Sequence, residues 1–190
     1  YLSNFIGSQN GVIYGGHSAG GMRSVLAASE DSNAIAVMGL DLVDANDLAL
    51  IAASNISIPI WGILGESSEC NSFGNGAFVY EHAIDGNALQ IVEADHCDFE
   101  FPTNFLCTSL CEGANNQFSD EDIEGVILNL STAYLLMHTG INEDGALWWI
   151  PGEEYYEYFI EQGLILQIVD LFIKKKELDG TSKEILFQNH

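Results

Sequence analysis

The segment GVIYGGHSAGG, residues 11–21, decides how the rest of this chain is interpreted. Residues 11–15 are β-branched, aromatic and glycine residues that predict a short strand, and residues 21–29 predict a helix. The pattern Gly-x-Ser-x-Gly occupies the turn between them, and it has chemical meaning where a strand leads directly into a helix. Such a turn is sharp, so we expect both Gly16 and Gly20 to be required, because side chains there would clash.

Alternating strands and helices continue along the chain after this turn. Apolar runs suited to strands occur at 34–40, 58–64 and 88–94, and residues 75–84 have a helical pattern. Alternation of this kind is typical of a parallel sheet with helices on its faces. We therefore predict a single α/β domain over residues 1–190, with a mostly parallel sheet flanked by helices.

The second half of the chain has a different character. Residues 120–139 predict a long helix, with Ser119 as its N-cap and Gly140 at its end. The aromatic and turn-rich stretch within residues 141–173 could form either a lid or a packing arm. The tail from Lys174 onward is polar and holds most of the lysines, which indicates a solvated segment.

The charge balance excludes several classes of function. The chain has 28 acidic residues against 5 Lys and Arg, a formal charge of −23. Such a surface repels phosphate backbones, anionic substrates and anionic membranes, so we expect no nucleic-acid partner. The charge favours solubility in a salty or cold environment, and attraction of a cationic partner is the alternative. No run of residues approaches the length of about 18 to 20 apolar residues that a membrane span needs.

Ser18 is the candidate nucleophile. The turn should raise its hydroxyl above the sheet edge at a helix N-terminus, where the Ala19 N–H can face a developing oxyanion. A serine hydroxyl needs a base within hydrogen-bonding reach, and His96 is our candidate because it follows the strand at 88–94. His82 and His138 lie inside predicted helices, and His190 is the last residue.

The carboxylate that orients this base has more than one candidate. Asp41 directly follows the strand at 34–40 and is preferred, whereas Glu69, and after it Glu66, follow the next strand. Asp44 and Asp95 are interpreted as surface or capping groups.

Four aromatic side chains could form walls of the substrate pocket, although ordinary core packing would explain each of them equally well: Tyr14, His17, Trp61 and Phe99. No metal or organic cofactor is needed for this chemistry. The four cysteines, Cys70, Cys97, Cys107 and Cys111, have no close Cys-x-x-Cys spacing, which disfavours a metal site. We expect two disulfides in a secreted or periplasmic protein, and four reduced thiols are the alternative.

Three motifs together resemble one branch of the α/β hydrolases. The segments GHSAGG at 16–21, GLDLVD at 39–44 and HCDF at 96–99 are similar to the chlorophyllase and platelet-activating-factor acetylhydrolase branch, over roughly residues 10–105. This resemblance implies Ser18, Asp41 and His96 as a catalytic triad. It also implies an α/β-hydrolase fold and cleavage of small-molecule or lipid-like carboxylic esters.

A second resemblance is to bacterial cutinases and related polyester hydrolases. It implies a disulfide between Cys70 and Cys97, which leaves Cys107 and Cys111 to pair locally. That group usually takes its acid from the loop in which this sequence offers Glu69 and no aspartate.

Only about ten residues precede the first predicted strand, whereas a complete hydrolase of this type has several strands there. We therefore expect this chain to be the C-terminal part of the full fold. Its N-terminal half would be another polypeptide or lie outside the sequence, and would supply the second oxyanion donor. A compact minimal hydrolase is the alternative. Two functional alternatives also remain: a peptidase or thioesterase with the same triad, or an inactive hydrolase fold that acts as an interaction module.

Overall fold

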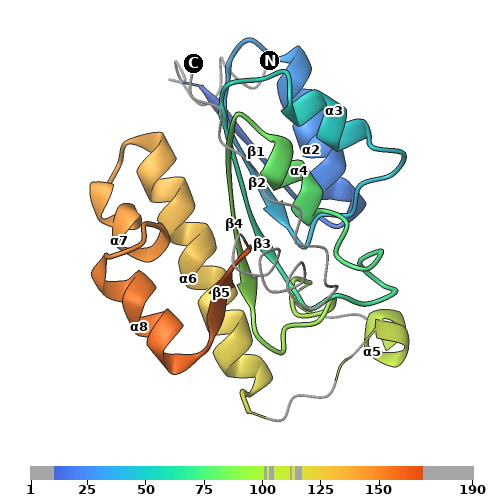
Figure 1. Cartoon of the computed structure of the whole chain (residues 1–190), viewed down its shortest axis with the longest axis vertical. Helices are drawn as coiled ribbons and strands as arrows, with labels where there is room; N and C mark the ends of the chain where they lie inside the picture. The colour runs from blue at the N-terminus through green and yellow to red at the C-terminus, as the bar shows by residue number, and fades with distance from the viewer. Residues whose placement is uncertain (1–10, 101, 103–104, 112, 114–116, 169–190) are drawn as a thin grey trace, which may run out of the picture.

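The computed structural model describes residues 11–100, 102, 105–111, 113 and 117–168, and all structural statements below concern these residues. Its centre is a five-stranded sheet with the order β1-β2-β3-β4-β5 (Figure 1). The strands are β1 (Val12–His17), β2 (Ala34–Leu40), β3 (Pro59–Leu64), β4 (Asp85–Ile91) and β5 (Ile165–Gln167). The first four strands are parallel, and β5 pairs antiparallel with β4.

Helices cover both faces of the sheet, as Figure 1 shows. One face is covered by α2 (Ala19–Glu30), α3 (Leu48–Ala53) and α4 (Ala77–His82), and the other by α6 (Asp120–Thr139). The remaining elements are α5 (Phe105–Cys111), η1 (Glu143–Gly145), α7 (Ala146–Trp149) and α8 (Glu154–Gln162). The predicted class is therefore confirmed: an α/β fold with a mostly parallel sheet between helices.

The alternation of side chains along the strands divides the interior into two cores. Along β3, Ile60 and Leu64 point into the core shared with α2, α3 and α4. Trp61 and Ile63 point into the core shared with α6, α7 and α8. Because both faces are buried, the central strands are almost continuously apolar, which is why they could be predicted from sequence.

The long helix α6 has the predicted ends. The Ser119 hydroxyl accepts a hydrogen bond from the Asp122 N–H, and the Asp122 carboxylate accepts one from the Ser119 N–H in return, which forms a capping box. At the other end Gly140 adopts a left-handed conformation with φ 68°. None of the described helices is both long and apolar enough to cross a membrane.

The described part of the stretch 141–173 packs against α6. Trp149 is fully buried, and its indole N–H donates to the Leu130 carbonyl of α6 at 2.9 Å. Beyond α8 the chain returns to the sheet as β5, which the sequence did not predict. Residues 169–173 of the stretch, and the tail from Lys174, lie outside the described residues.

One boundary difference affects the site. The strand predicted at 88–94 runs instead over Asp85–Ile91, because Glu93 adopts a left-handed φ of 62° that ends the extended backbone. His96 therefore lies in a loop beyond the strand instead of directly at its end. The short helices α3 and α5 were not predicted.

The first strand, β1, pairs with β2 and lies at one edge of the described sheet. Residues 1–10, which precede it, lie outside the described residues. The expectation of additional strands on this side stays a prediction.

Two buried tyrosines give a matched test of the core. The Tyr134 hydroxyl donates to the Val37 carbonyl at 2.8 Å, whereas the buried Tyr80 hydroxyl has no hydrogen-bond partner among the described residues. We expect Tyr134→Phe to lower the free energy of unfolding by about 1 kcal/mol and Tyr80→Phe to leave it unchanged or raise it. Urea unfolding of both variants measures this. Equal losses would contradict the assignment of the Tyr80 hydroxyl as unsatisfied.

Candidate active site

Ser18 lies at the turn between β1 and α2 in a strained backbone conformation. Its φ of 56° and ψ of −130° lie outside the regions that L-residues normally adopt. Backbone hydrogen bonds hold it on both sides, because the Ser18 N–H donates to Leu40 and the Ser18 carbonyl accepts from Gly21 and Val43. Strained residues persist where the surrounding structure fixes them, and they are frequent at functional sites.

The two glycines of the turn have different roles, which corrects the expectation that both are required. A Cβ atom on Gly16 would lie 2.5 Å from the backbone carbonyl group of Gly20, a distance that no packing adjustment accommodates. A Cβ atom on Gly20 would meet no described atom within 4 Å beyond its chain neighbours and the backbone of its own helix. The close approach therefore needs a glycine at residue 16 only, and Gly20 contributes its backbone.

This difference gives a second test. We expect Gly16→Ala to prevent the tight turn and to destabilise the protein by several kcal/mol or abolish its folding. Gly20→Ala, near the start of α2, should be neutral or stabilising by up to about 1 kcal/mol, because alanine favours the helix. Thermal unfolding of the two variants checks this prediction, and a large loss of stability in Gly20→Ala would contradict it.

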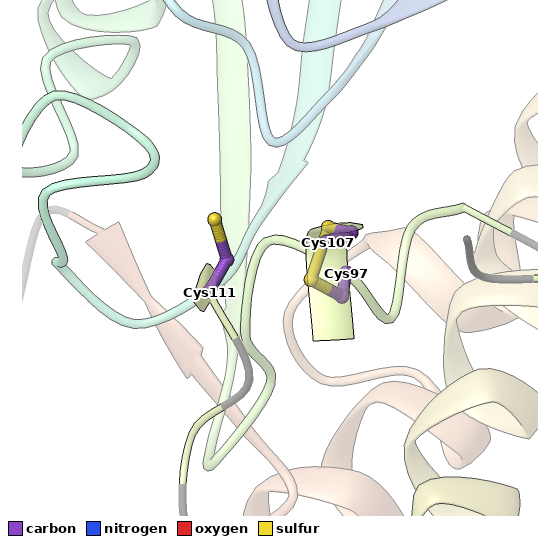
Figure 2. A group of neighbouring side chains, drawn as sticks. All are labelled: Cys97, Cys107 and Cys111. Carbon is purple, nitrogen blue, oxygen red and sulfur yellow. A yellow bond between two sulfur atoms is a disulfide. The ribbon is translucent and has the colours of Figure 1, made fainter. Parts of the chain in front are cut away.

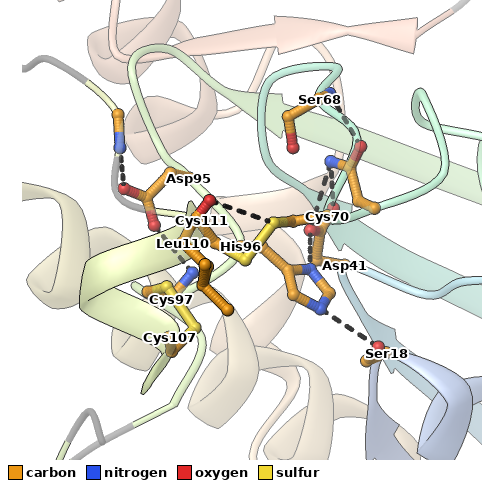
Figure 3. Close-up of a disulfide and its surroundings, with 12 residues drawn as sticks. Ser18, Asp41, Ser68, Cys70, Asp95, His96, Cys97, Cys107, Leu110 and Cys111 are labelled. Atoms are coloured by element: carbon orange, nitrogen blue, oxygen red, sulfur yellow. Dashed lines mark hydrogen bonds and ion pairs between the residues drawn. A yellow bond between two sulfur atoms is a disulfide. The ribbon is translucent and has the colours of Figure 1, made fainter. Parts of the chain in front are cut away.

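Ser18, His96 and Asp41 form one chain of hydrogen-bonding distances (Figure 3). The Ser18 Oγ lies 3.0 Å from His96 Nε2, and His96 Nδ1 lies 2.5 Å from Asp41 Oδ2. Asp41 is completely buried and His96 is 8% exposed. The three residues follow β1, β2 and β4, so they meet at the carboxyl edge of the parallel sheet, where sites in such folds gather.

The other candidate acids and bases make their contacts elsewhere in the structure. Glu66 accepts a hydrogen bond from the Glu93 N–H, and Glu69 is an exposed residue of the same loop. His82 is paired through Nδ1 with a carbonyl of its own helix. His138 is a residue of α6, and its ring packs against the rings of Trp61 and Tyr134. His190 lies outside the described residues.

The two aspartates interpreted as capping groups both bind backbone. Asp44 accepts from the N–H groups of Ala49 and Leu50 in the first turn of α3. Asp95 accepts from the N–H groups of Cys97 and Gly113 and thereby shapes the His96 loop.

Of the four predicted pocket residues, His17 lies beside His96 and Phe99 lies beside His17. The ring of His17 is 4.4 Å from the His96 ring and stacks on Phe99 at 6.2 Å. Tyr14 instead donates to Asp31 at the C-terminal end of α2, roughly 18 Å along the helix from Ser18. Trp61 packs in the α6 core, and its indole N–H donates to Asp85 at the amino end of β4.

Burial shifts the pKa values of two residues in this region, His17 and Asp98. Desolvation lowers the pKa of His17, so this ring is neutral in neutral solution and adds no positive charge beside His96. Burial raises the pKa of Asp98 to about 6. Since that value exceeds the ordinary 3.8, the contribution of Asp98 to folding is greatest in acid and is lost as the pH rises through about 6.

Asn71 also belongs to this site, although no sequence pattern predicted it. Asn71 is fully buried, and its Nδ2 lies 3.2 Å from both carboxylate oxygens of Asp41. It belongs to the loop between β3 and α4, thirty residues from Asp41, and no local pattern indicates its partner.

The predicted disulfide pairing is wrong, although two disulfides are present. Cys70 pairs with Cys111, and Cys97 pairs with Cys107. The reason is α5, which was not predicted: it places Cys107 and Cys111 about one turn apart, so each reaches a different loop. Figure 3 shows both disulfides beside His96.

The described residues contain one group of three side chains close enough to share a metal. The sulfur atoms of Cys97, Cys107 and Cys111 lie within 4.8 Å of one another (Figure 2). All three belong to disulfides, so none offers the thiolate that a metal requires.

The pairing can be read from a Glu-specific digest of the non-reduced protein. Cleavage separates Cys70 in residues 70–81 and Cys97 in residues 94–100 from Cys107 and Cys111, which stay together in residues 101–112. The observed pairing predicts one disulfide-linked species containing all three peptides. A linked pair of the first two peptides, with the third free in the mass spectrum, would contradict it.

Comparisons with known proteins give no family for this chain. No protein-family model matches it, and no curated protein is found as a relative. Any functional assignment therefore depends on the geometry of Ser18, His96 and Asp41.

Proposed function

We propose that this protein is a serine-dependent carboxylic ester hydrolase of the α/β-hydrolase type, acting through an acyl-enzyme intermediate. The observation that carries the proposal is the chain of contacts from Ser18 Oγ through the His96 ring to the buried Asp41 carboxylate. A hydroxyl, an imidazole and a carboxylate in this order are the parts that activate a serine nucleophile.

The reaction would follow from these contacts. His96 Nε2 accepts the Ser18 proton as Ser18 Oγ attacks the ester carbonyl, and Asp41 stabilises the positive imidazolium that forms. The protonated ring then gives its proton to the leaving alcohol, which departs from the tetrahedral intermediate. Water, deprotonated by the same ring, attacks the acyl-serine and releases the acid.

The oxyanion would be stabilised at the start of α2. Ala19 is the first residue of this helix, and N–H groups in the first turn have no partner within the helix. The positive end of the helix dipole adds to this stabilisation. The second donor was expected from the segment preceding β1, and residues 1–10 lie outside the described residues.

The net charge and the disulfides indicate which substrates and which compartment fit this activity. A formal charge of −23 disfavours anionic substrates, so we expect neutral or cationic esters. Two disulfides fit an oxidising compartment, and we propose that the protein is secreted or periplasmic.

The test uses a fluorophosphonate probe and p-nitrophenyl esters of short acyl chains with the full chain. We expect covalent labelling of Ser18 and ester turnover, and loss of both in Ser18→Ala. Asp41→Asn should lower kcat by about 10³- to 10⁴-fold because the ring loses its orienting carboxylate. Glu69→Gln is the matched control and should keep full activity.

Two outcomes would contradict the proposal. A wild-type chain that neither binds the probe nor turns over esters would favour an inactive hydrolase fold that acts as an interaction module. Faster turnover of peptides or thioesters than of oxygen esters would instead favour a peptidase or thioesterase with the same residues.

A further inference from the structure

We propose that Asn71 is a positioning residue of this site, which holds the Asp41 carboxylate in the orientation that His96 requires. The inference rests on the proposed function only for its kinetic consequences, since the contacts themselves involve Asn71, Asp41 and His96 irrespective of substrate. It adds a fourth side chain to the three that sequence patterns indicated.

The buried carboxylate of Asp41 requires several donors. It is completely removed from solvent, and a carboxylate without water is stable only where protein groups replace its hydration. Oδ2 faces His96 Nδ1, and Oδ1 accepts the Gly65 N–H at 3.0 Å. Asn71 Nδ2 lies 3.2 Å from each oxygen and bridges the two. Asn71 is thus the only described side chain besides His96 that is within hydrogen-bonding distance of this carboxylate.

The orientation of the Asn71 amide follows from its other partners. Its Oδ1 accepts from the Ser68 N–H at 2.9 Å and the Gly74 N–H at 3.0 Å. Both groups are donors only, so the oxygen must face them and the NH₂ group must face Asp41. The NH₂ group also donates to the Glu66 carbonyl at 2.8 Å. The amide therefore cannot rotate without losing several buried hydrogen bonds.

The loop around Asn71 is shaped to hold this side chain. Ser72, Phe73 and Gly74 are three consecutive residues with left-handed φ values of 52°, 59° and 70°, and the Gly74 N–H donates to the Asn71 amide oxygen. The preceding residue, Cys70, is tied to α5 by a disulfide. Asp41 itself has a φ of 39°. Non-glycine residues in this region are costly and persist only where their surroundings fix them.

The arrangement has a chemical reason. When His96 accepts the serine proton, the imidazolium must be met by an ionised carboxylate with one oxygen directed at Nδ1. A bridging amide prevents rotation of the carboxylate and donates hydrogen bonds, yet it carries no charge. A lysine or arginine in its place would neutralise the charge that His96 uses. An amide therefore orients Asp41 without competing for it.

Two substitutions separate positioning from simple support of the loop. Asn71→Asp keeps the oxygen that accepts from Ser68 and Gly74, removes the donor that faces Asp41, and places a second negative charge against it. Asn71→Ala removes all of these bonds. The matched control is Asn75→Ala, since Asn75 lies in the same loop and makes two hydrogen bonds to the Asp44 backbone, but none to Asp41.

The first readout needs no enzymatic activity. A proton on His96 Nδ1 in a short bond to a carboxylate should give a far-downfield proton NMR resonance, assigned by its loss in Asp41→Asn. We expect this resonance to shift or disappear in both Asn71 variants and to persist in Asn75→Ala. An unchanged resonance in folded Asn71 variants, or an equal change in Asn75→Ala, would overturn the proposal.

A reciprocal measurement covers the case in which the Asn71 variants do not fold. In Asp41→Asn, the side-chain amide cross-peak of Asn71 should shift in a ¹⁵N correlation spectrum, and that of Asn75 should stay in place. Absence of any shift at Asn71 would overturn the assignment.

The kinetic readout connects the contact to catalysis. Because small displacements of a catalytic group can cost up to about 10²-fold in rate, we expect both Asn71 variants to lose about 10- to 100-fold in kcat with little change in KM. Full kcat in folded Asn71→Asp would count against the positioning role. If the wild type hydrolyses no ester but the resonances respond as expected, the proposed function fails and the positioning contact stands.

Discussion

The other contacts of this site depend on the hydrogen bond between His96 and the buried carboxylate of Asp41. It joins a loop beyond β4 to the end of β2, fifty-five residues apart in the chain. A carboxylate without solvent is tolerated only with protein donors around it, and Gly65, Asn71 and His96 supply them. The loops that follow β3 and β4 are accordingly held in fixed conformations.

The sheet makes this bond possible by its direction. Because β1 to β4 are parallel and adjacent, their carboxyl ends meet at one edge, and the residues that follow them converge. Ser18 follows β1 through a turn that only a glycine at residue 16 permits. The disulfides Cys70–Cys111 and Cys97–Cys107 then tie α5 to the two loops that flank His96 and Asn71.

Much of the scaffold could be predicted because its information is local. The apolar run at 34–40 and the helix at 120–139 were predicted with their observed bounds, since burial on both faces and a capping box leave clear patterns. Ser18, Asp41 and His96 could be proposed because each follows a predicted strand, although His96 lies farther from its strand than expected. The strand β5 was missed because three residues carry too little pattern to identify.

The sequence by itself determined the alternation of strands and helices, the sharp turn at Ser18 and the acidic character of the surface, because each depends on neighbouring residues or on composition. The tertiary structure decided which carboxylate faces His96, which cysteines pair, that Tyr14 and Trp61 lie away from Ser18, and that Asn71 contacts Asp41. These outcomes depend on where loops that are distant in sequence meet in space. The short helix α5 was not predicted, and its position makes the disulfide pairing differ from the predicted one.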